Sequence, residues 1–285
     1  MTSRSSGVEA DQGTASWFRL LLLVQVLAAG LFGVVPYFFP GAAADAGGYP
    51  GTEAFIYRLA GAATIGYLVA AAAELLKPAW YRFRIPAAAS YTFNAAAVIA
   101  ALMTLFESRG NFWVWFILIA AAAFVLILIY VTRRNEGPAA PEHPSLDRPA
   151  RVLLTLASLA ATFFGLAPLL AAEWFVDFAG FDPSDLFIYR LAGAATLGYA
   201  FGGYLSIRDG RWEAIKVQNL AAIVFNGLSA IAALMYVVNP PFDAVNSDVM
   251  VASPSWVVWV ILVAATLFTV ALTILHVRKG RLAAG

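Results

Sequence analysis

One 13-residue segment occurs twice in this chain with a single difference. Residues 55–67 read FIYRLAGAATIGY, and residues 187–199 read FIYRLAGAATLGY. The same offset of 132 residues relates two further pairs of anchors. These are Phe32-Gly-x-x-Pro36 with Phe164-Gly-x-x-Pro168, and Phe93-Asn94 with Phe225-Asn226. Because all three anchors share one offset without gaps, the sequence predicts a duplicated structural unit.

The composition places this unit in a membrane. Hydrophobic residues make up 61% of the chain and charged residues 12%, compared with roughly 45–50% and about 25% in soluble domains. The apolar residues form unbroken segments that are long enough to cross a hydrocarbon core about 30 Å thick as helices, rather than the alternating pattern of barrel strands. The segments are residues 17–39, 53–76, 85–106, 111–132, 150–172, 185–207, 214–238 and 254–277. We therefore predict an all-α, polytopic membrane protein with eight transmembrane helices.

Charged residues predict the orientation of these helices. Most lysines and arginines fall in the connections on one side, such as Arg82, Arg133 and Arg211, whereas the opposite connections carry acidic residues such as Asp45 and Asp182. Positive residues favour the cytoplasmic side of a membrane. We expect a multi-pass protein of the cell (plasma or inner) membrane with both termini in the cytoplasm.

Four crossings in each unit give both units the same orientation, so the sequence predicts two parallel four-helix repeats. The first repeat covers residues 17–132 and the second covers residues 150–278, joined by a cytoplasmic linker at residues 133–149. Residues 1–16 and 279–285 are expected to be cytoplasmic tails. Trp115-x-Ile-Leu matches Trp259-x-Ile-Leu at an offset of 144 instead of 132, which places a twelve-residue insertion in the outer loop near 239–253.

Arg58 and Arg190 are the first candidate ligand-binding residues. Each lies six residues after a predicted N-cap, Thr52 or Ser184, which places it about 9 Å below the outer end of its helix. An arginine at that depth faces a partner, a cavity or the membrane interface. One interpretation is a pair of cations that bind an anionic ligand or a lipid headgroup.

The alternative interpretation of both arginines is a structural clamp. Acidic partners, Glu53 and Asp185, precede them by five residues. The prolines at positions 36 and 168 also free a backbone carbonyl on a neighbouring helix, at Phe32 and Phe164. Finally, a long arginine side chain can extend toward the headgroups. The sequence leaves both interpretations open.

A second group of candidates lies deeper in the membrane. Tyr67 and Asn94 have similar predicted depths in the first repeat, as do Tyr199 and Asn226 in the second. We expect a Tyr–Asn hydrogen bond in each repeat, acting between helices. The other interpretation is that these side chains line a shared cavity.

Tyr57 and Tyr189, which precede the two arginines, complete the set of candidate ligand-binding residues. The same helices carry small residues at Ala60, Gly61 and Gly66, a pattern typical of close helix packing.

The sequence offers no catalytic or metal-binding residues. Cysteine is absent, and the two histidines, His143 and His276, fall in the linker and at a cytoplasmic helix end. No predicted span has a carboxylate near its centre, and no phosphate-binding loop or catalytic triad is evident. We expect no cofactor, no metal and no nucleic-acid partner, and the sequence argues against an enzyme.

The pattern formed by Arg58, Leu59, Gly61, Ala62 and Gly66, repeated at residues 190–198, resembles small four-helix bacterial membrane proteins of the DoxX-like type. The resemblance implies a tandem of two DoxX-like bundles. Some members of that group are linked to quinone-associated redox complexes, but this chain has no cofactor ligands that would carry such a role.

Three functions remain, and the third, a membrane enzyme that acts on a lipid or quinone, needs a polar cluster that the sequence does not show. The first is a non-catalytic module that binds or transports a small molecule or lipid, with a site between the two repeats in the outer leaflet. It predicts that Arg58 and Arg190 converge on a cavity. The second is a structural or assembly subunit of a larger membrane complex, which predicts no cavity and an apolar surface for partner subunits.

Overall fold

The computed structural model describes residues 5–48, 53–76, 78–107, 110–135, 140–142, 144–239 and 255–284. In these residues the chain is helical apart from short connections and one isolated β-bridge. The long helices are α1 (Ser5–Phe38), α3 (Ala54–Leu76), α4 (Trp80–Phe106), α5 (Phe112–Arg134), α6 (Arg148–Leu170), α8 (Leu186–Asp209), α9 (Trp212–Val238) and α10 (Trp256–Ala284). The short elements are α2 (Pro40–Gly47), α7 (Ala172–Ala179) and the 3₁₀ turn η1 (Pro183–Asp185). The predicted all-α class is confirmed.

Seven of the helices in the described ranges are long and apolar enough to cross a membrane: α1, over Ser16–Phe38, and α3, α4, α5, α6, α9 and α10. The multi-pass class is therefore confirmed. Helix α8 has 24 residues, enough to span a bilayer. It falls outside the set of seven because Arg190 and several glycines and tyrosines lower its hydropathy.

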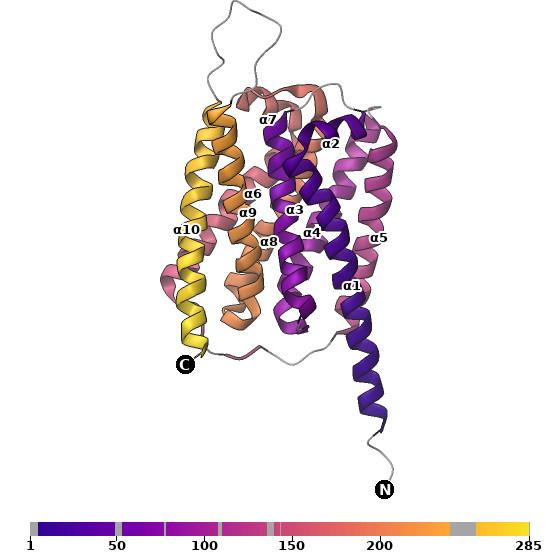
Figure 1. Cartoon of the computed structure of the whole chain (residues 1–285), viewed down its shortest axis with the longest axis vertical. Coiled ribbons are helices and arrows are strands. Elements are labelled where there is room, and N and C mark those ends of the chain that lie inside the picture. The colour runs from indigo at the N-terminus through magenta and orange to yellow at the C-terminus, as the bar shows by residue number, and fades with distance from the viewer. Residues whose placement is uncertain are drawn as a thin grey trace, which may run out of the picture.

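The long helices lie side by side along one axis, and the start of α1 and the end of α10 lie at the same end of the bundle (Figure 1). Helix α3 packs mainly against α1 and α9, and α8 packs mainly against α6 and α4. Helix α5 covers α4, and α10 covers α9. By contrast, α3 and α4 contact each other much less, as do α8 and α9. Each of the central helices α3 and α8 therefore packs against one helix of its own half and one of the other half.

Two eight-residue helices, α2 and α7, lie across the opposite end of the bundle (Figure 1). They follow α1 and α6, where the sequence predicts only the ends of apolar segments. Each ends at a glycine in the left-handed conformation, Gly48 with φ 71° and Gly180 with φ 67°. Glycine adopts this conformation without steric cost, so it ends a helix readily. The two glycines differ by the repeat offset of 132 residues.

Glycines on α3 and α8 allow close approach of α1 and α6. A Cβ atom at Gly61 would lie 2.7 Å from the carbonyl oxygen of Gly33, and one at Gly193 would lie 2.6 Å from that of Gly165. Small residues at such crossings let helix backbones pack closely in membranes.

The chain between the two halves crosses the end of the bundle that carries the basic residues. Leu146 N donates to Gly210 O at 2.8 Å, and Trp212 N donates to Pro144 O at 2.9 Å. Asp147 caps α6 by accepting from Ala150 N, and it pairs with Lys279 of α10 at 3.3 Å. These contacts fix the linker to the α8–α9 turn and to the end of α10.

Candidate ligand cavities

The centre of the bundle is a contact between α3 and α8. Tyr67 Oη donates to Ala195 O at 3.1 Å, and Tyr199 Oη donates to Ala63 O at 2.8 Å. The two rings lie with their centroids 4.8 Å apart, and both tyrosines are buried. The predicted Tyr–Asn hydrogen bonds are therefore wrong: each tyrosine bonds to the backbone of the other half.

The two asparagines bond locally instead. Asn94 Nδ2 donates to Ser90 O, and Asn226 Nδ2 donates to Ala222 O, both at 2.8 Å and both one turn back along the same helix. The sequence indicated matching depths but could not show that the tyrosines bond across the centre while the asparagines bond within their own helices and line the cavities.

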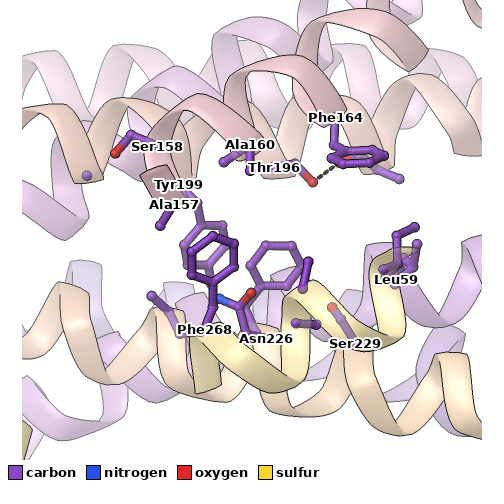
Figure 2. Close-up of a pocket in the computed structure, with 18 of the residues that line it drawn as sticks. Leu59, Ala157, Ser158, Ala160, Phe164, Thr196, Tyr199, Asn226, Ser229 and Phe268 are labelled. Atoms are coloured by element: carbon purple, nitrogen blue, oxygen red, sulfur yellow. Dashed lines mark hydrogen bonds between the residues drawn. The ribbon is translucent and has the colours of Figure 1, made fainter. Parts of the chain in front are cut away.

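Two cavities flank this centre. The larger, which we name the α5 cavity, has a volume of about 380 Å³ and is lined by α1, α3, α4 and α5, with α8 closing one side. The smaller, the α10 cavity, has a volume of about 160 Å³ and is lined by α6, α8, α9 and α10, with α3 closing one side. Figure 2 shows the α10 cavity, with Ser158 and Phe164 on one side and Asn226 and Ser229 on the other.

The walls of the two cavities correspond in part. Many residues that line the α5 cavity have repeat equivalents that line the α10 cavity, at an offset of 132, or of 144 on the last helix of each half, whereas others, such as Trp113 and Gln218, have none. The pairs include Phe32 and Phe164, Pro36 and Pro168, Tyr57 and Tyr189, Thr64 and Thr196, Tyr67 and Tyr199, Phe93 and Phe225, Asn94 and Asn226, and Phe124 and Phe268. Most of the lining is apolar, as is usual for sites that take lipidic or small organic molecules.

Six of the eight candidate residues line these cavities. Tyr57, Tyr67 and Asn94 line the α5 cavity, and their equivalents line the α10 cavity. Arg58 and Arg190 line neither cavity. The cavities also lie on either side of the Tyr67–Tyr199 contact, whereas the sequence led us to expect one site between the two halves.

The unpartnered polar groups in the cavities are not duplicated. Gln25, 3% exposed, lines the α5 cavity, and neither its Oε1 nor its Nε2 has a hydrogen-bond partner among the described residues. Its repeat equivalent is Ala157. In the α10 cavity the corresponding unpartnered atoms belong to other positions: Gln218 Oε1, Asn219 Oδ1, Ser158 Oγ and Ser229 Oγ.

An unsatisfied buried polar atom costs free energy comparable to a lost hydrogen bond. A ligand group or ordered water at these positions would remove that cost. Sequence reasoning missed these residues because a single polar residue within an apolar segment does not show whether its side chain faces a cavity, another helix or lipid.

Arg190 is held by an ion pair that the sequence did not predict. Its Nη1 donates to Glu107 Oε2 and to Thr104 Oγ1, both at 2.9 Å, and its Nη2 donates to Glu107 Oε1 at 2.5 Å. The bidentate geometry is the strongest form of an arginine–carboxylate contact. Glu107 is the C-cap of α4, so the clamp joins α8 to α4 across the two halves. Its signal in the sequence is one acidic residue at the outer end of the segment predicted at 85–106.

The expected partner of Arg190 has another role. Asp185 caps α8, accepting from Ile188 N, and it accepts from Tyr57 Oη at 2.5 Å. The predicted cap at Ser184 is therefore corrected to Asp185, while the cap predicted at Thr52 lies outside the described residues. Tyr189 Oη donates to Asp182 O at 2.8 Å. Both tyrosines thus bind the connection that leads into α8.

Arg58 differs from Arg190. The ion pairs found within the described ranges do not include Arg58. The Nε atoms of both arginines are buried there without a hydrogen-bond partner. Tyr37 is close enough to interact with it electrostatically. None of the predicted local partners is bonded to it.

No three histidine, aspartate or glutamate side chains of the described residues gather as a metal site. His276 lies within hydrogen-bond distance of Asn219 Nδ2, at 3.2 Å. His143 is outside the described ranges. Comparison of the chain with protein families, with curated proteins and with solved structures finds no match.

Proposed function

We propose that this protein is a non-catalytic membrane module that binds lipidic small molecules in two lateral cavities, one in each half. The observation that carries the proposal is the correspondence between the two cavity walls. Interiors of proteins are close-packed, so a cavity in each half is a departure from ordinary packing. Two equivalent apolar cavities are the expected result when a binding unit is duplicated.

The shape of the α10 cavity supports an elongated ligand. Its lining on α9 runs from Ile215 to Ser229, which is about 20 Å at the helical rise of 1.5 Å per residue. A narrow apolar channel of that length fits a hydrocarbon chain. The unpartnered amide oxygens of Gln218 and Asn219 lie toward one end of this stretch and would accept hydrogen bonds from a ligand end group.

The α5 cavity is wider and has a different polar group. Gln25 presents both a donor and an acceptor without partners in the described part of the chain. A ligand end group that itself offers a donor and an acceptor would satisfy both atoms. We therefore propose that the two halves bind related chains with different end groups.

The proposal includes the topology. Eight spans, with α8 as the eighth, form two parallel four-helix repeats with both termini in the cytoplasm. Three observations support it: α8 matches α3 in sequence and packs against α6 as α3 packs against α1; α1 and α10 begin and end at the same end of the bundle; and that end carries the basic residues. The resemblance to DoxX-like proteins stays a prediction, as does transport.

The alternative, a subunit that only assembles a larger complex, predicts helices packed without cavities. Exposed apolar residues on α1, α5, α6 and α10, such as Leu27, Ile119, Leu159 and Leu267, suit acyl chains as well as partner subunits. The paired cavities therefore favour the binding function.

Filling the cavities one at a time tests the proposal. Ala29 lines the α5 cavity, and its equivalent Ala161 lines the α10 cavity. Phenylalanine at either position would occupy the space that the ligand needs. Leu27→Phe, at a side chain 65% exposed on α1, is the matched control.

The full chain and the three variants would be purified in mild detergent, and the retained molecules would be identified by mass spectrometry. We expect Ala29→Phe and Ala161→Phe each to lose a different retained molecule, while Leu27→Phe retains both. Identical retained molecules in all four proteins, with folding intact, would contradict the proposal.

A further inference from the structure

The two arginines of the repeat have the same sequence context and different partners. Arg190 and Arg58 both lie in the segment FIYRLAGAAT. Arg190 is 3% exposed and is neutralised by a bidentate carboxylate. Arg58 takes part in none of the ion pairs of the described residues, and its Nε, like that of Arg190, is buried there without a hydrogen-bond partner. The difference must come from the surroundings of the two side chains.

The repeat offset identifies the source of the difference. Glu107 is the C-cap of α4, and the residue 132 positions later, Asn239, is the C-cap of α9. Thr104, the second acceptor for Arg190, corresponds to Tyr236. Helix α3 packs against α9 as α8 packs against α4. The first half of the chain therefore has the arginine but not the carboxylate that the repeat would place opposite it.

A guanidinium at this depth in a membrane is costly without an anion or a polar cavity. Snorkelling and the negative end of α9 reduce that cost only in part. The neighbouring Tyr37 donates its hydroxyl to Leu228 O at 3.0 Å, and a neutral hydroxyl oxygen does not supply the negative charge that would neutralise a guanidinium. At Arg190 the guanidinium donates to both oxygens of one carboxylate. The same two donors fit two oxygens of a phosphate group.

From this comparison we infer that Arg58 binds an external oxyanion, of the phosphate or phosphodiester class, at the position that Glu107 fills in the other half. The anion comes from an anionic lipid headgroup or from free phosphate. Arg58 lines neither cavity, so this site is separate from the proposed ligand cavities, although the lipid source rests on the chain being embedded in a membrane.

Supplying the missing carboxylate is the sharpest test. Asn239→Glu gives Arg58 the partner that Arg190 already has, and Asn239→Gln is the matched neutral control. Arg58→Gln removes the cation. Asn239→Glu keeps the arginine and adds an internal ion pair, so a folding failure of Arg58→Gln leaves the test intact.

The full chain in phosphatidylcholine nanodiscs would be titrated with phosphatidylglycerol, and the detergent-purified chain would be titrated with inorganic phosphate. Native mass spectrometry and the thermal midpoint would report binding. We expect one tightly held anion in the wild type and in Asn239→Gln, with at least tenfold weaker binding in Arg58→Gln and Asn239→Glu. Binding of phosphatidylglycerol alone identifies the headgroup as the source, whereas binding in both arms identifies any accessible phosphate.

Two results would overturn the inference. The first is equal binding of both anions by the wild type, Arg58→Gln and Asn239→Glu. The second concerns Asp243 and Asp248, which lie outside the described residues: if anions bind only after both are changed to asparagine, then Arg58 is neutralised within the chain. Ala29→Phe and Ala161→Phe should keep the anion, so failure of this inference is distinguishable from failure of the cavity proposal.

Discussion

The contact between α3 and α8 is built from duplicated residues, whereas the outer ends of α4 and α9 are built from residues that differ. At the contact, Tyr67 and Tyr199 exchange equivalent hydrogen bonds with opposite backbones. At the outer ends, Glu107 is replaced by Asn239. The unpartnered polar groups of the cavities differ in the same way.

This comparison separates two kinds of constraint. Residues that face the partner half must keep their size and direction, because a change on either side disturbs both halves. The unpartnered polar positions of the cavities and the outer ends of α4 and α9 differ between the halves, even though Glu107 contacts Arg190 of the other half. The duplicated segment is thus largely a packing interface, and the differences between the halves indicate where their ligands or partners differ.

The largest expected effect is at the duplicated contact. A Cβ atom at Gly66 would lie 2.8 Å from Ala221 O and would also meet the hydroxyl of Tyr199, and one at Gly198 would lie 2.6 Å from Ala89 O. Backbone atoms cannot move aside as a flexible side chain can. We expect Gly66→Ala and Gly198→Ala each to cost about 3 kcal/mol or more, lowering the thermal midpoint by roughly 10 °C.

Gly30→Ala is the control for these glycines, because nothing lies within 4 Å of its Cβ position on α1. Alanine is the better helix former, so its midpoint should be unchanged or slightly raised. If Gly66→Ala is as stable as Gly30→Ala, then α3 does not lie as close to Ala221 of α9 and Tyr199 of α8 as described.

A smaller effect is expected where the halves differ. Glu107→Gln removes the carboxylate charge from Arg190, whose side chain is 4% exposed, whereas the side chain of Glu107 is 36% exposed. The substitution leaves the buried guanidinium of Arg190 without a countercharge. We therefore expect the free energy of unfolding to fall by about 2 kcal/mol, measured as a lower thermal midpoint. Arg58→Gln in phosphatidylcholine should cost less, since no ion pair of the described residues is broken. If Glu107→Gln and Arg58→Gln lower the thermal midpoint equally, the two arginines do not differ in how they are held.

The fold was largely predictable because it depends on properties that are local in sequence. Apolar length predicts helices long enough to span a membrane, and seven such helices are present in the described residues. The short helices α2 and α7 were missed because eight residues that follow an apolar segment are too few to show a hydrophobic period of their own. The pairing of α3 with α9 could not be predicted, since it depends on which helix faces accept each other in three dimensions.

The candidate site was predictable in composition and not in arrangement. Tyr67 and Asn94 were identified by their depth in the membrane. Depth does not tell which way a side chain points around the helix axis, so the predicted hydrogen bond between them was wrong. The partner of Arg190 is 83 residues away in sequence. Residue spacing in the sequence predicts contacts only between neighbours on one helix. The nearby acid, Asp185, caps α8 and accepts a hydrogen bond from Tyr57 instead.

The smallest expected effect concerns a contact that only the second half has. Asp147 caps α6 and pairs with Lys279 and Arg278 of α10, whereas the position 132 residues earlier is Ala15. Burial opposes ionisation of Asp147, but the Ala150 amide and the Lys279 ammonium outweigh it and hold the pKa of this carboxyl below its usual value of 3.8. A carboxyl whose pKa is lowered by folding stabilises the folded state above its unfolded pKa, and this contribution is lost as the pH falls through the folded value. We therefore expect the thermal midpoint of the wild type to fall by a few degrees below about pH 4.

Asn caps a helix nearly as well as Asp, so the control variant Asp147→Asn removes only the charge. The thermal midpoint of this variant should be slightly lower than that of the wild type at neutral pH, and it should fall less on acidification. Parallel pH curves for the two proteins would show that the tie between α6 and α10 contributes nothing to stability, and that the second half is held no more firmly than the first at this end.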